Sequence, residues 1–212
     1  MKCNTILNSI IKSDDIIIGG LFSKYNFIYI IVASLIGGIG LLYNSISFII
    51  YAMLISPLGE PILKLISAII LKNNSLLFTN FLSLIFKIGI CYTIGLGLGY
   101  FNSKMDYFKT PTNEMKHRTN IKHILADIAI ALLVGFIAII SLEYKNISVI
   151  VGIGIASTIL LPIVNSGLYH GKYLDRGNYN NIKDGNNSFK LGLTHVIFII
   201  LSAVLTLLSK CN

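Results

Sequence analysis

A carboxylate, Glu60, lies in an apolar stretch of the chain, residues 44–62, with a proline on either side of it. Pro57 and Pro61 each lack a backbone N–H and clash with the preceding helical turn, so a helix cannot pass through both without freeing carbonyl groups. In lipid, such groups must be satisfied by protein or by water in a cavity. An ionisable side chain at such a place is costly and marks functional sites. The stretch therefore predicts a broken intramembrane helix that lines something polar.

The residues around Pro162 repeat this pattern at an offset of 101 residues, with Ser157 in the place of Ser56 and Pro162 in the place of Pro61. Asn165, one turn after Pro162, is placed to satisfy carbonyl groups that this proline frees. The alternative is a chance similarity between helices that are rich in Ile and Ser. A candidate intramembrane polar site that combines both stretches with a further carboxylate consists of Ser56, Pro57, Glu60, Pro61, Asp127, Ser157, Pro162 and Asn165.

The ionisable residues also have structural interpretations. Lys64 follows Glu60 by four residues, so the two side chains can pair on one helical face. Asp127 falls near the start of its segment, where the helix dipole favours a carboxylate without any ligand. Lys87 can extend to the membrane interface only if its segment sits asymmetrically across the bilayer. A functional role and a structural role are therefore both open for each of these charged residues.

The uncharged polar residues have simpler interpretations. Asn80 and His195 lie inside apolar segments, where such side chains more often form hydrogen bonds between helices than bind ligands. The hydroxyl groups of Ser56, Ser157 and Thr158 can bond back to carbonyl groups of their own helices.

The sequence contains no catalytic or metal-binding constellation. Its four histidines lack the paired spacing of metal sites, and its three cysteines form neither a metal motif nor a disulfide framework. The glycine clusters at 37–40 and 95–99 have no preceding strand and no following lysine, both of which a phosphate loop requires. We therefore expect helix-packing glycines, no enzymatic activity, no metal and no cofactor.

The composition indicates an integral, multi-pass membrane protein. Of the 212 residues, 54% are hydrophobic and only 12% are charged, whereas a soluble domain carries about 25% charged residues. The mean hydropathy is +0.76. The net charge of +8 comes from basic residues scattered among the loops, which is typical of lysines that face anionic lipid. We expect the lipid bilayer as a partner and no binding to nucleic acid.

The apolar pattern predicts an all-α membrane helix bundle. Six apolar segments are expected at about 25–43, 44–71, 76–100, 123–142, 148–168 and 189–208. They divide the chain into an amphipathic interfacial segment (1–24), a first three-helix repeat (25–100), a basic polar loop (101–122) and a second three-helix repeat (123–208). A second polar loop, rich in Asn and Gly, is expected over 169–188.

Two units of three apolar segments predict an inverted repeat with proline-broken helices, because three crossings reverse the second unit. Such repeats place binding sites at broken helices near the middle of the membrane. We therefore predict that Pro57–Pro61 and Pro162 approach each other there. Residues 44–72 and 148–168 can instead be re-entrant segments. Positive-inside logic weakly places both long loops in the cytosol if all six segments cross.

The run from Ala52 to Ile62 reads Ala-Met-Leu-Ile-Ser-Pro-Leu-Gly-Glu-Pro-Ile and follows a glycine-rich segment that ends in Asn44-Ser45. It resembles the signature of the membrane proteins called the domain of unknown function 389 family. Looser resemblances occur at Glu114-Met115, Arg118-Thr119, Asp127, Ala131, Gly135, Gly152, Ala156, Leu160 and Pro162. Departures from the family pattern occur at Tyr51, Gly59-Glu60 and Leu161. The resemblance covers about residues 13–208 and implies a multi-pass membrane protein of unassigned activity.

Two functions are compatible with these observations. The first is a transporter or channel-like protein for an ion or a small polar solute, based on the repeat, the proline breaks and the intramembrane polar side chains. The second is a non-transporting membrane scaffold or assembly protein, for example of a cell envelope, based on the small size and the family departures. The glycine-rich first segment suits a homo-oligomer in either case.

Overall fold

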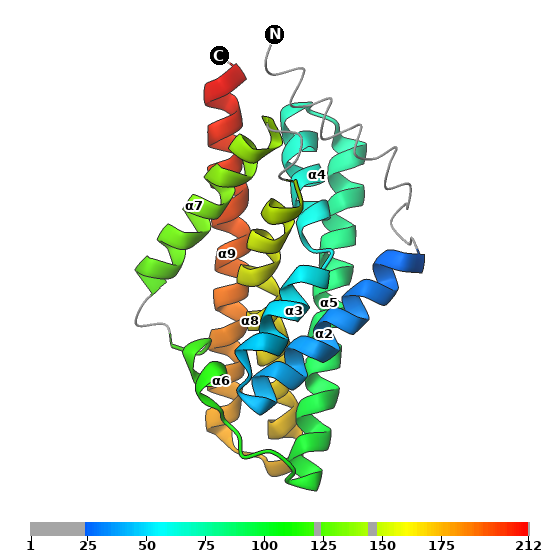
Figure 1. The fold of residues 1–212 in the computed structure, drawn as a ribbon, viewed down its shortest axis with the longest axis vertical. Coiled ribbons are helices and arrows are strands. Elements are labelled where there is room, and N and C mark those ends of the chain that lie inside the picture. Colours follow the sequence, from blue (N-terminus) through cyan, green and yellow to red (C-terminus); the bar gives the residue numbers. More distant parts are fainter. Residues whose placement is uncertain (1–23, 121–123, 144–147, 212) are drawn as a thin grey trace.

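The computed structural model describes residues 24–120, 124–143 and 148–211, and these residues form helices without any strand. The all-α prediction is confirmed for this part of the chain, while almost all of the predicted interfacial segment 1–24 lies outside it. The helices, shown in Figure 1, are α2 (Lys24–Tyr43), α3 (Ile46–Ile55), α4 (Gly59–Ile70), α5 (Asn74–Met105), α6 (Asn113–His117), α7 (Ile124–Glu143), α8 (Ser148–Arg176) and α9 (Tyr179–Cys211).

The apolar stretch around Glu60 is broken, as predicted. Helix α3 ends at Ile55 and α4 begins at Gly59, and the two helices are bent by 45° relative to each other. The backbone N–H of Ser56 makes the last bond of α3, to the Ala52 carbonyl at 3.1 Å, and Pro57 cannot continue the ladder. The prolines thus cause the bend.

Several helices are long and apolar enough to cross a membrane. Apolar spans occur in Asn26–Tyr43, Asn74–Met105 and Tyr179–Lys210, and α3 with α4 adds a fourth if the bent pair is one span. A shorter apolar helix, Ile124–Ile140, lies in α7. These spans agree with a membrane protein, but by length and composition they do not amount to the six predicted crossings.

Pro162 does not break its helix. The prediction of a second proline break is wrong, because α8 runs without interruption from Ser148 to Arg176 with Pro162 inside it. The carbonyl that this proline leaves without an N–H, that of Thr158, is instead satisfied by a side chain from α9.

The predicted polar loop 169–188 is also helical. Helix α8 continues to Arg176 and α9 begins at Tyr179, so the connection shrinks to Gly177 and one further residue, and Gly177 takes a φ of +64°. Asn181, Gly185 and Ser188 recur on one buried face of α9. Helical periodicity is present here, but small polar residues carry it, so the hydropathy pattern does not show it.

The closest helix packing joins α5 and α8. A Cβ atom added at Gly95 or Gly99 of α5, or at Gly167 or Gly171 of α8, would collide with backbone atoms of the other helix. Small residues four apart on both helices let the two backbones approach, as in membrane helix pairs. The predicted packing role of the 95–99 glycines is thereby confirmed for Gly95 and Gly99.

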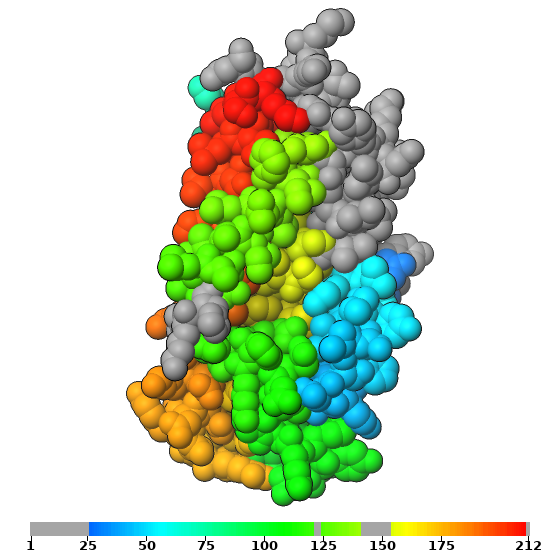
Figure 2. All heavy atoms as spheres, turned by 60° about the vertical axis from the view of Figure 1, so that its left-hand side comes forward, coloured from blue at the N-terminus to red at the C-terminus, as the bar shows by residue number. Residues whose placement is uncertain are grey.

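The chain direction reverses between its two halves. In Figure 1, α2 runs downward, α3 with α4 upward and α5 downward, whereas α7 runs upward, α8 downward and α9 upward. The C-terminal end of α5, α6 and the α8–α9 connection gather at the lower end, and α4 joins α5 at the upper end. Figure 2 shows the face on which α7 packs against α9, with residues 105–120 below it beside α2 and α3.

Candidate functional site

The Glu60 carboxylate is held by residues from three helices. Asn26 of α2 donates to its Oε2 at 3.0 Å, and Lys64 of α4 pairs with its Oε1 at 2.9 Å. Lys87 of α5 lies 3.5 Å from Oε2. The expected Glu60–Lys64 pair is therefore present, but it is one part of a larger cluster.

Lys87 also satisfies a carbonyl at the proline break. Its Nζ donates to the Pro57 carbonyl at 3.0 Å, and the residue is only 6% exposed. Pro61, four residues after Pro57, has no N–H that could occupy this carbonyl in a helix. Lys87 thus points into the bundle instead of extending to the membrane interface. The hydroxyl of Ser56, for which a bond back to its own helix is predicted, has no partner among the described residues.

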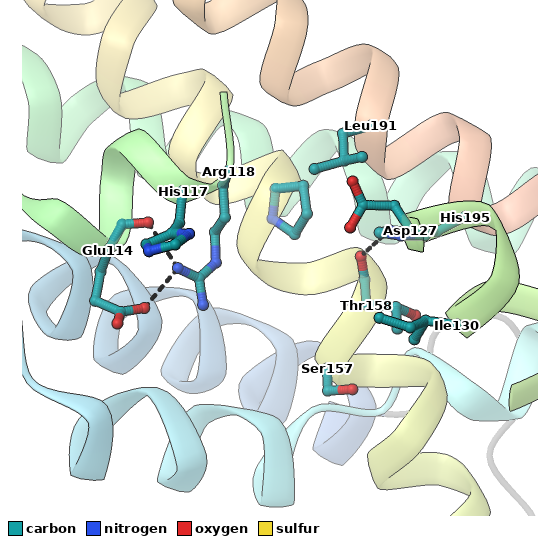
Figure 3. A pocket seen from close by; sticks show the side chains of 10 residues that line it. Glu114, His117, Arg118, Asp127, Ile130, Ser157, Thr158, Leu191 and His195 are labelled. Carbon is teal, nitrogen blue, oxygen red and sulfur yellow. Dashed lines mark hydrogen bonds and ion pairs between the residues drawn. The ribbon is translucent and has the colours of Figure 1, made fainter. Parts of the chain in front are cut away.

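The carbonyl that Pro162 frees is also satisfied by a basic side chain from another helix. His195 of α9 places its Nδ1 2.8 Å from the carbonyl oxygen of Thr158, four residues before Pro162 (Figure 3). A carbonyl oxygen can only accept, so Nδ1 carries the hydrogen and donates. This hydrogen bond confirms His195 as a partner between helices and lets α8 continue through Pro162.

The two capped carbonyls occupy matching places in the chain. Pro57 and Thr158 are 101 residues apart, which is the offset of the sequence repeat, and each lies four residues before a proline. In each half the donor is a basic side chain on the third apolar segment, Lys87 or His195. The repeat in the sequence matches the prolines but does not reveal their partners, since Lys87 and His195 do not align at this offset.

A cavity of about 440 Å³ opens beside Pro162. Figure 3 shows the polar side chains around it. The lining residues that carry polar or proline side chains are Glu114, His117 and Arg118 of α6 and its C-terminal end, Asp127 of α7, Ser157, Thr158 and Pro162 of α8, and His195 of α9. The volume falls in the range of small-molecule sites, about 300–1,000 Å³.

Two of the charged side chains at this cavity, Glu114 and Arg118, form an ion pair, whereas Asp127 forms none with a described residue. Arg118 Nη1 lies 2.7 Å from both the carboxylate and the backbone carbonyl oxygen of Glu114, so these two charges compensate each other. Asp127 lies in the first turn of α7, as its structural interpretation, a carboxylate at a helix N-terminus, predicts. No ion pair joins Asp127 to a described residue. Ser157 and Thr158 bond back to their own helix at 2.7 and 2.9 Å, as expected.

Asn165 does not satisfy the carbonyl freed by Pro162. It is fully buried, and its Nδ2 donates to the Met115 carbonyl at 3.0 Å and to Ser188 Oγ at 3.1 Å. The Ser188 hydroxyl in turn donates to the Pro162 carbonyl at 2.9 Å. Asn165 therefore fastens α6, beside the cavity, to α8 and α9.

The predicted site residues fall into two clusters. Asp127, Ser157 and Pro162 line the cavity, whereas Glu60 and the Pro57 carbonyl belong to the Lys87 cluster. Ser56 and Pro61 are buried, and they are adjacent in sequence to Pro57 and Glu60 of the Lys87 cluster. Asn165 belongs to neither cluster and holds α6 in place.

Sequence reasoning missed several members of both clusters. These are Asn26, which matches Asp127 at the repeat offset, and the α6 pair Glu114 and Arg118. The offset of 101 was the signal that could have found Asn26. Asn80, expected between helices, bonds instead to the Leu76 carbonyl of its own helix at 2.8 Å. Within the described ranges, no group of three or more His, Cys, Asp or Glu side chains could hold a metal ion.

One comparison with known proteins gives a match. The family model described as "Domain of unknown function (DUF389)" matches residues 53–201, which is more than half of the chain and confirms the resemblance of the Ala52–Ile62 run. No curated protein and no solved structure matches the chain.

Proposed function

The chain belongs to the family described as Domain of unknown function (DUF389), and on that premise we propose that it is a multi-pass membrane transporter or channel-like protein for an ion or a small polar solute. The cavity beside Pro162 is the observation that carries this proposal. It brings a carboxylate, a histidine and a charge pair together where a proline interrupts the hydrogen bonding of a helix. We propose that the protein moves its solute and does not convert it.

The arrangement of the helices supports six crossings in two inverted halves. The three segments of the first half and the three of the second run in opposite directions in Figure 1. In each half, the carbonyl four residues before a proline accepts a hydrogen bond from the third segment, at 3.0 Å in the first half and 2.8 Å in the second. Large apolar side chains are exposed on outer faces, as lipid requires, among them Phe78, Leu133 and Ile197. In transporters built of inverted repeats, sites lie at the interface of the repeats, typically at discontinuous helices; here α3 and α4 are discontinuous, whereas α8 is continuous.

Purified protein in liposomes should pass at least one of sodium, potassium, protons or chloride faster than empty liposomes do. The Asp127→Asn variant should reduce that flux about tenfold or more, because the charge is removed from the cavity while the side chain keeps its size. Asp106→Asn is the matched control, because Asp106 pairs with Arg176 at the exposed lower end of the bundle. Its flux should equal that of the wild type.

Absence of flux for every ion tested, in protein that is monodisperse and correctly inserted, would contradict the transport proposal. The scaffold function would then be favoured, because it requires folded helices but no conducting cavity.

A further inference from the structure

We propose that the cavity beside Pro162 binds a monovalent cation at the Asp127 carboxylate, and that a proton taken up by His195 at Nε2 displaces this cation. The proposal rests on the transport function and names its substrate class. The cation is an alkali ion with some of its water, or a protonated amine. Four observations carry the proposal.

The first is the balance of charge in the cavity. Of the described lining residues, Arg118 is the permanent cation, and the Glu114 carboxylate and backbone carbonyl occupy it at 2.7 Å each. Among the described lining residues, Asp127 is then the carboxylate that no cation compensates. One excess negative charge suits a monovalent ligand, whereas tight divalent sites recruit several carboxylates. An anionic ligand would meet the repulsion of Asp127 and find Arg118 already paired.

The second is the fixed tautomer of His195. Its Nδ1 hydrogen is committed to the Thr158 carbonyl, so only Nε2 can gain or lose a proton. Asp127 and His195 both line the cavity, and Figure 3 shows the Asp127 carboxylate near the hydrogen bond between His195 and Thr158. A proton from solution that binds Nε2 creates an imidazolium next to Asp127. That internal cation takes the place of the bound one.

The third is the remaining set of titratable and charged groups around His195. Helix α6 and its C-terminal end contribute Glu114, His117 and Arg118, and α7 contributes Asp127. The lining residues of α8 carry no titratable side chain. His117 is exposed and takes no part in the hydrogen bond to Thr158. His195 and Asp127 are therefore the pair that couples proton to cation.

The fourth is a precedent within the chain. At the matching place in the first half, the ammonium of Lys87 lies 3.0 Å from the Pro57 carbonyl and 3.5 Å from the Glu60 carboxylate. A monovalent cation on a carboxylate at a proline-freed carbonyl is thus what the first half already contains, tethered to the chain. In the second half a titratable imidazole replaces the lysine, and a cavity remains beside it.

Equilibrium binding of radiolabelled sodium, rubidium and methylammonium to the purified full chain in detergent tests the proposal. The wild type should bind at least one of these ions, and acidification from about pH 8 to about pH 5 should weaken that binding about tenfold or more, because an imidazole titrates in this window. Binding of sodium or rubidium alone identifies an alkali-ion site, and binding of methylammonium alone identifies an amine site. Asp127→Asn should abolish the binding.

His195→Asn is the decisive variant. The asparagine amide nitrogen corresponds to Nδ1, so it can still donate to the Thr158 carbonyl, but nothing at the place of Nε2 can titrate. Cation binding should persist, and it should no longer weaken between about pH 8 and about pH 5 as the imidazole response does in the wild type. His170→Asn is the control, because the Nδ1 of His170 pairs with the Tyr92 hydroxyl and His170 is absent from the cavity lining.

Three results would overturn the proposal: no binding of any of the three cations, equal wild-type binding at both pH values, or an unchanged response to acid in His195→Asn. The wild-type measurements need no variant to fold. Flux of chloride without cation binding would refute this inference and leave the transport function standing, whereas cation binding without flux would do the reverse.

Discussion

Valine in place of Gly99 is expected to destabilise the protein severely, because it forces two tightly packed helices apart. A Cβ atom at this position would collide with the backbone carbonyl of Leu168 on α8. Backbone cannot turn aside as a side chain can, so α5 and α8 must separate along their most extensive contact. We expect a loss of about 3 kcal/mol or more, at the upper end of overpacking costs. Thermal unfolding in detergent should show a Tm lower by about 6 °C or more.

Gly97→Val is the matched control for this prediction. Gly97 lies two residues away on the same helix, and a Cβ atom there has nothing within 4 Å. Its substitution should change stability by less than about 0.5 kcal/mol, as is usual for positions without close neighbours. Equal Tm values for the two variants would show that α5 and α8 do not pack backbone to backbone.

Glu60→Gln is expected to have a comparably large effect on stability. Lys87 is 6% exposed and its carboxylate partner is Glu60, so the substitution leaves a buried ammonium without a counter-charge. Breaking a buried pair on one side costs about 3–5 kcal/mol. Lys64, also bonded to Glu60, is more exposed and loses less. Thermal unfolding of the purified variant measures the loss.

A second substitution separates this electrostatic cost from a general loss of packing. Glu60→Gln combined with Lys87→Met removes both charges, so the double variant should recover part of the lost stability. Recovery stays partial, because the Pro57 carbonyl then lacks its donor, at a cost of about 1–3 kcal/mol. Asp106→Asn, at an exposed pair, should cost less than about 1 kcal/mol. A double variant no more stable than Glu60→Gln would contradict the buried pair.

The local consequences of single residues could be predicted from the sequence. Pro57 and Pro61 break a helix because each lacks a donor, and this follows from residue type alone. The family followed from the Ala52–Ile62 run, which is specific in its order of residues. The all-α fold followed from apolar runs that are long enough to cross a membrane.

Partners that come from distant segments could not be predicted. Pro162 has the same residue type as Pro61, yet α8 continues through it, and His195 and Ser188 reach the Thr158 and Pro162 carbonyls from α9. Those contacts span 37 and 26 residues of chain. The first half differs in having a second proline, Pro57, at the place that Thr158 takes in α8. The helical ends around Gly177 were missed for a related reason, since the buried face there is made of Asn, Gly and Ser and has no apolar period.

Two halves of three crossings each should run in opposite directions through the membrane, and the proposed transport function depends on this arrangement. Single cysteines at Asn74, Lys109 and Tyr179 test it most directly, in a background with Cys3→Ser and Cys211→Ser in which the buried Cys91 is kept. All three positions are exposed. A membrane-impermeant thiol reagent should label Lys109→Cys and Tyr179→Cys from one side of the membrane and Asn74→Cys from the other. Labelling of Lys109→Cys and Tyr179→Cys from opposite sides, or of Asn74→Cys from the same side as Lys109→Cys, would contradict the two inverted halves.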